Sequence, residues 1–334
     1  MAVEASPDQA GGYVDGRPAT GQGIAMNDRT TTAAGAPARP SPWAVWASAA
    51  RLRTIPASIA PVLLGVVLAY ADGLGHAPAA VAALLGAMLI QIGTNYANDY
   101  FDWVKGADTA DRLGPRRAVQ AGLVSPEAMR RAAVIVFGLA VLVGLYLAWR
   151  GGWPILVVGI ASILCGVLYT GGPFPLGYRG LGDVFVLLFF GPVAVAGTYW
   201  VQALEMGWLP LVAGLGPGLI STAILAVNNL RDRKTDARAG KRTLAVRFGA
   251  RFTRIEYTTC LFGAGLVPAG LLAAGVADAW ILLPLAMLAV AVPVNRTVWT
   301  TTDGVALNGA LADTGKLLML YAVLFSIGWV LAAA

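Results

Sequence analysis

Two short stretches of the sequence bring carboxylate and carboxamide side chains together with basic residues. The first runs from Gln91 to Asp108 and reads QIGTNYANDYFDWVKGAD. The second runs from Asn228 to Thr243 and reads NNLRDRKTDARAGKRT. Hard divalent cations such as Mg²⁺ take oxygen ligands, and Lys and Arg side chains bind phosphate oxygens. The two stretches therefore indicate a site that binds Mg²⁺ and a diphosphate.

Helical spacing places the polar side chains of each stretch on one face. In a helix with 100° per residue, five side chains of the first stretch fall in one stripe covering roughly a quarter to a third of the circumference. They are Gln91, Asn95, Asn98, Asp99 and Asp102. Asp232 and Asp236 are four residues apart and also share a face. The alternative is that these acids only cap helices and form solvated ion pairs, but two matched clusters favour a metal–diphosphate site.

The composition indicates which elements must hold these residues. Hydrophobic residues make up 57% of the 334 residues and charged residues 13%, whereas a soluble domain has about 25% charged residues. This excludes a soluble globular enzyme and favours a polytopic membrane protein. The single histidine, His76, excludes a His-rich metal site and a Ser-His-Asp triad. Cys165 and Cys260 lie in separate apolar runs, so we expect neither a disulfide framework nor a CxxC redox site.

The apolar segments predict an all-α membrane protein. A membrane-spanning helix needs about 20 mostly apolar residues, and nine segments qualify as candidates. They are 54–71, 79–101, 129–149, 153–170, 181–201, 209–230, 254–274, 279–295 and 314–333. The two acidic stretches lie four helices apart, which predicts two four-helix halves around a central cavity, plus a ninth helix. Residues 1–41 are predicted to be a disordered tail and residues 42–334 the membrane domain.

The basic residues predict the orientation of these helices. With the N-terminus in the cytoplasm, all of the 24 Lys and Arg except Arg150 fall on the cytoplasmic side. This asymmetry agrees with the positive-inside rule. We therefore expect a multi-pass protein, most simply in a bacterial cytoplasmic membrane, with both acidic stretches facing the cytoplasm.

The two stretches resemble the aspartate-rich motifs of the UbiA-type intramembrane prenyltransferase superfamily. Many members space the first motif N-x-x-x-D-x-x-x-D, whereas here Gly106 occupies the third position and the next acid is Asp108. That departure is similar to the naphthoate branch, the 1,4-dihydroxy-2-naphthoate polyprenyltransferases of menaquinone synthesis. The segments 51–56, 169–173 and 180–183 add weaker similarity.

The resemblance and the residue chemistry together suggest the same roles. Mg²⁺ is expected on Asn98, Asp102, Asp108, Asp232 and Asp236. The diphosphate is expected on Lys105, Arg112, Arg117 and Lys241. The four aspartates and Tyr169 are the candidate catalytic residues, because the position of Tyr169 resembles a tyrosine that the family places near the reacting carbon. Tyr169 could instead belong to an interfacial aromatic belt.

Arg53 and Asn95 are the candidates for binding the aromatic acceptor. Arg53 could equally be a membrane anchor, and Asn95 could bridge two helices. The predicted reaction transfers a polyprenyl group from a polyprenyl diphosphate to 1,4-dihydroxy-2-naphthoate, with loss of CO₂ and diphosphate, to give demethylmenaquinone. No nucleic acid is expected as a partner.

Three other functions compete with this hypothesis. A transferase of the same superfamily could use another acceptor, such as 4-hydroxybenzoate, homogentisate, a chlorophyllide or haem. A cation-coupled transporter would also contain intramembrane acids, but these usually lie near the bilayer midplane rather than at the helix ends. A non-catalytic lipid-binding scaffold would not need two acidic sites.

Overall fold

The computed structural model describes residues 40–107, 113–114 and 117–333, and every regular element within them is a helix. This confirms the all-α prediction for the described residues, which from Ser41 onward belong to one compact unit. The predicted tail lies outside the described residues except for its last two positions, and it remains a prediction.

The described residues form fourteen helices, and the connection from α3 to α4 spans residues 105–125. The first six are α1 (Pro42–Ala49), η1 (Leu52–Thr54), α2 (Pro56–Ala71), α3 (Ala77–Val104), α4 (Pro126–Gly151) and α5 (Trp153–Leu168). The next four are η2 (Gly177–Arg179), α6 (Gly182–Phe189), α7 (Pro192–Ala203) and α8 (Leu209–Arg238). The last four are α9 (Leu244–Ala273), η3 (Ala279–Leu285), α10 (Ala286–Thr300) and α11 (Gly304–Ala333). The three η elements are short 3₁₀ helices.

Seven helical segments of the described chain are long and apolar enough to cross a membrane. They are α3, α4, α8, α9 and α11, together with the continuous segments Gly182–Ala203 and Ala279–Thr300. Pro42–Thr54 and Pro56–Ala71 form an eighth candidate that is bent by 53°, and α5 has only 16 residues. The predicted count of nine spans and the division into two halves are therefore not confirmed, because two predicted segments fall short of the length that a bilayer requires.

Side-chain caps fix where several helices begin. The hydroxyls of Ser41, Ser125 and Thr243 accept hydrogen bonds from the third residue of the following helix, at 3.3, 3.2 and 3.3 Å. Such bonds satisfy N–H groups that the first helical turn leaves without a partner. The Thr243 cap ends the second acidic stretch and starts α9, so it fixes the length of the loop that carries Lys241.

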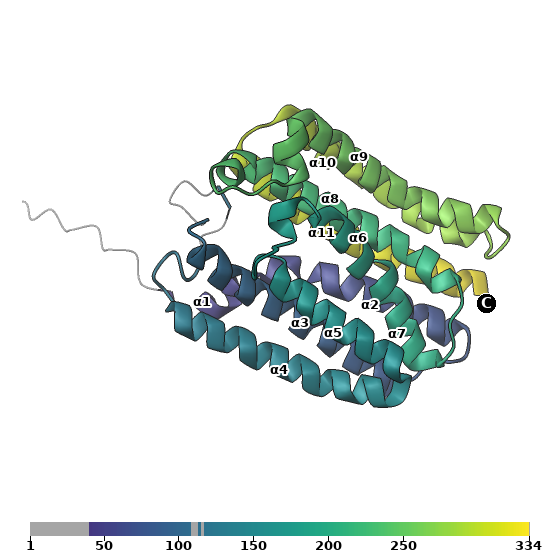
Figure 1. The fold of residues 1–334 in the computed structure, drawn as a ribbon. Coiled ribbons are helices and arrows are strands. Elements are labelled where there is room, and N and C mark those ends of the chain that lie inside the picture. Colours follow the sequence, from purple (N-terminus) through teal and green to yellow (C-terminus); the bar gives the residue numbers. More distant parts are fainter. Residues whose placement is uncertain (1–39, 108–112, 115–116, 334) are drawn as a thin grey trace, which may run out of the picture. The chain divides into compact units, whose positions relative to one another are not determined.

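The two helices that carry the acidic stretches belong to different groups of neighbours. α3 packs against α4 and α5, whereas α8 packs against α9, and α9 against α10 (Figure 1). Between these groups α2 contacts α7 and α11, and α11 also contacts α8. α3 and α8 are not major packing partners. Their polar ends must therefore be connected by the loops that follow them.

Candidate active site

Asp102, in the last turn of α3, is the centre of a buried ion cluster. Its Oδ2 lies 2.5 Å from the Arg117 guanidinium, and its Oδ1 accepts a hydrogen bond of 2.9 Å from the Tyr178 hydroxyl. The Lys241 ammonium lies 3.1 Å from the same Oδ1 and 4.0 Å from Oδ1 of Asp236. Only 1% of the Asp102 side chain is exposed. Lys241 thus connects the two acidic stretches, which lie about 130 residues apart in the sequence.

The Arg231 side chain organises the end of α8. Its Nε and Nη2 donate to the two carboxylate oxygens of Asp232, at 2.8 and 2.5 Å. Its Nη2 also donates to Asn228, and its Nη1 donates 2.6 Å to Asn308 on α11. Asn308 in turn donates to the carbonyl of Leu113. This network joins α8 and α11 to the loop that follows α3.

The connection between α5 and α6 supplies the third side of the site. Thr170 donates from its hydroxyl to Oδ1 of Asn98 at 2.8 Å, and its carbonyl accepts from the Lys105 ammonium at 2.5 Å. Burial lowers the pKa of Lys105 below its ordinary value, the charge of Asp102 offsets part of that shift, and the charge of Lys241 adds to it. Lys105 and Lys241 therefore lie close enough to repel each other, which favours an anion bound beside them.

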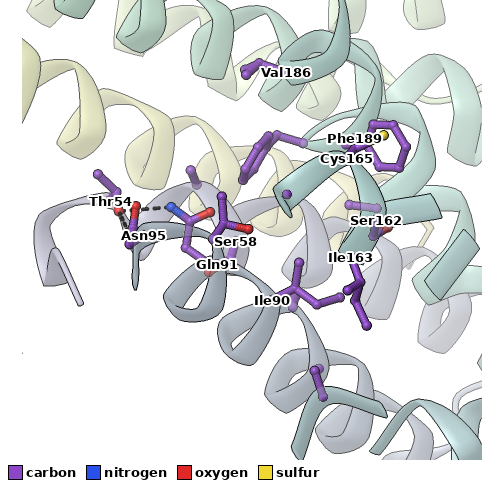
Figure 2. Close-up of a pocket in the computed structure, with 18 of the residues that line it drawn as sticks. Thr54, Ser58, Ile90, Gln91, Asn95, Ser162, Ile163, Cys165, Val186 and Phe189 are labelled. Carbon is purple, nitrogen blue, oxygen red and sulfur yellow. Dashed lines mark hydrogen bonds between the residues drawn. The ribbon is translucent and has the colours of Figure 1, made fainter. Parts of the chain in front are cut away.

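A cavity of about 800 Å³ adjoins this polar region. Asn98, Arg117, Tyr169 and Arg231 border its polar end, while apolar residues of α3 to α7 form most of the remaining wall. Figure 2 shows Ile90, Ile163 and Phe189 among the apolar side chains that line it, with Thr54, Gln91 and Asn95 close together on one side and Ser162 on the other. A charged end joined to a long apolar space suits an amphiphile with an anionic head group and a hydrocarbon chain.

The predicted acceptor residues lie at the break between α1 and α2. Asn95 donates to the carbonyl of Ala50 at 2.9 Å and to the Thr54 hydroxyl at 3.3 Å, and Gln91 donates to the same hydroxyl (Figure 2). Asn95 therefore bridges two helices, which was the alternative interpretation of this residue. It also lines the cavity, as does the exposed Arg53, so both positions remain predictions for acceptor binding.

The structure joins six of the twelve predicted site residues in one network of contacts. Asp102, Arg117, Lys241 and Asp236 form one chain of ionic contacts. Asn98 and Lys105 join it through Thr170 and Tyr178. Asp232 pairs with Arg231. Two further predicted residues, Asp108 and Arg112, lie outside the described residues.

The donor set fits Mg²⁺ in its chemistry. Every predicted ligand offers a carboxylate or carboxamide oxygen, the donor type that Mg²⁺ prefers. Among the described residues, no group of three or more His, Cys, Asp or Glu side chains is close enough to hold a metal ion. Asp102 and Asp232 are instead paired with Arg117 and Arg231. Binding of a metal would therefore require these carboxylates to exchange cationic partners.

Sequence reasoning gave no role to Tyr178, Thr170 or Asn308. Tyr178 and Thr170 lie in the connection between α5 and α6. The sequence of this connection has no helical periodicity from which its contacts with α3 could be predicted. Asn308 is a carboxamide in α11, a mostly apolar helix that also carries Asp313 and Lys316, and polar residues in membrane helices are functional candidates by default. That rule would have identified Asn308, but not the two loop residues.

Within the described residues the chain is an all-helical bundle with several candidate membrane spans, an aspartate-containing polar end and an apolar cavity, which defines it as a membrane protein with a polar site beside the cavity. Residues 58–320 match the UbiA prenyltransferase family. The chain belongs to this family, which confirms the resemblance found in its two acidic motifs.

Relatives of known function cover most of the chain. It is 40% identical to the 1,4-dihydroxy-2-naphthoate octaprenyltransferase of Mycobacterium tuberculosis over 284 residues, 84% of this chain and 95% of the relative. It is 37% identical to the enzyme of the same name from Escherichia coli, over 85% of this chain and 94% of the relative. The human UbiA prenyltransferase domain-containing protein 1 is 31% identical, over 83% of this chain and 81% of the relative.

Solved structures show the same fold at low sequence identity. A UbiA homologue from Archaeoglobus fulgidus, bound to DMAPP and Mg²⁺, superposes with a TM-score of 0.61 at 11% identity. The alignment covers 85% of this chain and 99% of that one. The same protein bound to GPP and Mg²⁺ gives a TM-score of 0.53 at 13% identity, over 82% of this chain and 100% of that one.

Proposed function

We propose that the protein transfers a polyprenyl group from polyprenyl diphosphate to 1,4-dihydroxy-2-naphthoate, releasing diphosphate and CO₂ and giving demethylmenaquinol, the two-electron-reduced form of demethylmenaquinone. The observation that carries this proposal is the chain of contacts from Asp236 through Lys241 to Asp102, whose partner Arg117 borders an apolar cavity of about 800 Å³. Relatives at 37–40% identity named for this reaction support the choice of acceptor.

The oxygen ligands proposed for Mg²⁺ are Asn98, Asp102, Asp108, Asp232 and Asp236. Bound there, the metal would neutralise diphosphate charge and so favour departure of the leaving group. Lys105, Arg112, Arg117 and Lys241 bind the remaining phosphate oxygens. Because Asp102 now holds Arg117 and Lys241 at 2.5 and 3.1 Å, the incoming diphosphate takes over cations that the carboxylate holds in its absence.

The cavity accommodates the hydrocarbon chain and keeps water away from the reacting carbon. Its wall is mostly apolar, so an allylic carbocation formed at its polar end would meet little bulk water. Tyr169 borders the cavity at that end, and an aromatic face can stabilise a positive charge. The acceptor ring attacks the allylic carbon through the ring carbon that carries the carboxylate. The bond from that ring carbon to the carboxylate then breaks, CO₂ leaves, and the electron pair of the broken bond restores the aromatic ring.

Arg53 and Asn95 are proposed to contact the acceptor. The carboxylate of the naphthoate would meet the Arg53 guanidinium, a favourable charge-assisted contact. Other aromatic acceptors, such as 4-hydroxybenzoate or homogentisate, would need the same polar contacts and are the alternatives to test.

We further propose nine membrane spans, with the bent α1–α2 pair and α5 added to the seven long segments. Two four-helix halves and a ninth helix, α11, would then surround the cavity. The protein would lie in the bacterial cytoplasmic membrane with its polar end facing the cytoplasm, because the basic residues flank that end.

The test uses membranes that contain the protein, a labelled polyprenyl diphosphate, Mg²⁺ and one acceptor at a time. We expect labelled product with 1,4-dihydroxy-2-naphthoate, little with 4-hydroxybenzoate, and none when EDTA removes the metal. If 4-hydroxybenzoate alone were prenylated, it would take the place of 1,4-dihydroxy-2-naphthoate as the proposed acceptor. Full activity in EDTA would contradict the role of Mg²⁺.

A further inference from the structure

The ring of Tyr178 has two cations of the candidate site close to it. It belongs to η2, in the connection between α5 and α6, and no motif includes it. The Lys105 ammonium and the Lys241 ammonium each lie 4.8 Å from the centre of its ring. An ammonium group within about 6 Å of an aromatic face is attracted by the ring's quadrupole. One ring therefore contacts a lysine from each of the two acidic stretches.

The tyrosine is held at both its side chain and its backbone. Its hydroxyl donates 2.9 Å to Asp102, the same carboxylate oxygen that Lys241 approaches. Its carbonyl accepts a hydrogen bond of 2.9 Å from the backbone N–H of Arg242, the residue after Lys241. The Arg247 guanidinium donates 2.7 Å to the next carbonyl, that of Arg179. These contacts fasten the connection to both stretches and fix the ring relative to the two lysines.

Electrostatics explain why such a fixed ring matters. Two ammonium groups that face one anion must be held close together before it arrives, although they repel each other. Among the described residues, the hydrogen-bond acceptors of Lys105 are the carbonyls of Thr170 and Gly172, which carry no net charge. The negative face of the Tyr178 ring offsets part of the repulsion, and its rigid plane limits where each ammonium can lie.

We propose that Tyr178 is a positioning residue that presets the spacing of Lys105 and Lys241 for one diphosphate group. This inference rests on the proposed function, since it assigns these lysines to the diphosphate of the donor. The ring provides the positioning, and the hydroxyl bond to Asp102 orients the ring.

The experiment measures binding of inorganic diphosphate to the purified full-length protein by calorimetry, with and without Mg²⁺. Tyr178→Phe keeps the ring and should stay within about threefold of the parent affinity, whereas Tyr178→Leu should bind roughly tenfold more weakly. In kinetic assays, Tyr178→Leu should raise the KM for the prenyl donor but leave the KM for the acceptor unchanged. A purely structural role would change both.

Phe174→Leu is the matched control. The Arg179 guanidinium lies 4.2 Å from the centre of the Phe174 ring in the same connection, so this variant removes a cation–π contact outside the proposed site. It should bind diphosphate as the parent does. Phenylalanines with increasing ring fluorination at position 178 preserve the shape and weaken the negative face, so affinity should fall stepwise even if Tyr178→Leu does not fold.

Two results would overturn the inference. Equal losses of diphosphate affinity in Tyr178→Phe and Tyr178→Leu would mean that the hydroxyl bond to Asp102, not the ring, positions the two lysines. Unchanged affinity across the fluorinated series would also exclude the ring. Failure of the parent protein to bind diphosphate or to transfer a prenyl group would instead contradict the proposed function, so the two failures are distinguishable.

Discussion

Asp102 and Asp236 differ in how much their charges contribute to the stability of the folded protein. Asp102 is buried and neutralises the buried Arg117 guanidinium, so its removal would leave a buried cation without its carboxylate. Removing one partner of a buried ion pair strongly lowers the free energy of unfolding. Asp236 lies 4.0 Å from Lys241, which also has Asp102 as a partner at 3.1 Å. A substitution at Asp236 therefore tests the chemistry of the site with the smaller effect on folding.

We predict that Asp236→Asn lowers prenyl transfer at least ~100-fold, because it removes one charge from the metal and diphosphate site. Its free energy of unfolding should change less than that of Asp102→Asn, which removes a carboxylate paired at 2.5 Å with the buried Arg117 guanidinium. Radiolabel transfer and thermal unfolding in detergent measure the two effects. Asp313→Asn is the control, since Asp313 is exposed and pairs with the exposed Lys316. Near-normal transfer by Asp236→Asn would remove this residue from the site.

The lowered pKa of Lys105 predicts a pH dependence. A lysine whose pKa is lowered loses its charge at a lower pH than an ordinary lysine, whose pKa is about 10.4. The kcat/KM for the prenyl donor should therefore fall on the alkaline side before that pH, since this ratio reports the free enzyme. Lys105→Arg stays charged, so the fall should move to higher pH.

Competition by inorganic diphosphate across the same pH range separates this effect from ionisation of the acceptor, because diphosphate binding involves no acceptor. If the alkaline fall in kcat/KM were the same in Lys105→Arg as in the parent protein, a group other than Lys105 would be responsible for it.

At the scale of helices, close packing between α8 and the α6–α7 junction supports the cavity wall. A Cβ atom on Gly218 would lie 2.5 Å from the backbone oxygen of Leu187, and one on Gly214 would lie 2.7 Å from Pro192. Small residues four apart let membrane helices approach closely. The glycines of α8 therefore allow the broken segment α6–α7 to lie directly against it.

We predict that Gly218→Ala destabilises the protein by about 1–3 kcal/mol, because the added methyl group meets backbone atoms that cannot move aside. Thermal unfolding in detergent measures the change. Gly138→Ala on α4 is the control, since a Cβ atom there has no neighbour within 4 Å and alanine favours helix more than glycine does. Equal stability of both variants would contradict the close packing.

At the scale of the whole molecule, the distribution of basic residues is the strongest feature. Arg150 is the exception, and the structure gives it a specific use. Its guanidinium donates 2.6 and 2.9 Å to the carbonyls of Val201 and Gln202, where α7 ends. Helix C-termini have carbonyls without intrahelical partners, so this arginine ties α4 to α7 at the end of the bundle away from the acidic stretches.

The proposed orientation predicts opposite labelling of two exposed positions at opposite ends of the bundle. The parent for this test is a variant in which Cys165 and Cys260 are replaced by alanine. In spheroplasts, whose cytoplasmic membrane is intact, Glu205→Cys should react with a membrane-impermeant maleimide. Ala237→Cys, in the last turn of α8 and within the second acidic stretch, should react only after the membrane is permeabilised. Both positions are exposed, so burial does not bias the comparison. The reverse pattern would place the polar end outside the cytoplasm.

The sequence by itself determined the helical class, the two acidic stretches and the family. Apolar segments and the spacing of Asn95, Asn98 and Asp102 are properties of a single helix, so local periodicity is enough to recognise them. The number of spans was less predictable, because the bend between α1 and α2 and the length of α5 depend on their neighbours.

Only the tertiary structure decided how the two stretches meet. α3 and α8 are not major packing partners, and their ends are connected by Lys241, which follows α8, and by Tyr178, which follows α5. Such contacts join residues far apart in sequence, and their geometry depends on how the helices between them pack. No periodicity within one segment encodes that geometry, so the lysine–tyrosine–lysine arrangement became visible only in the folded chain.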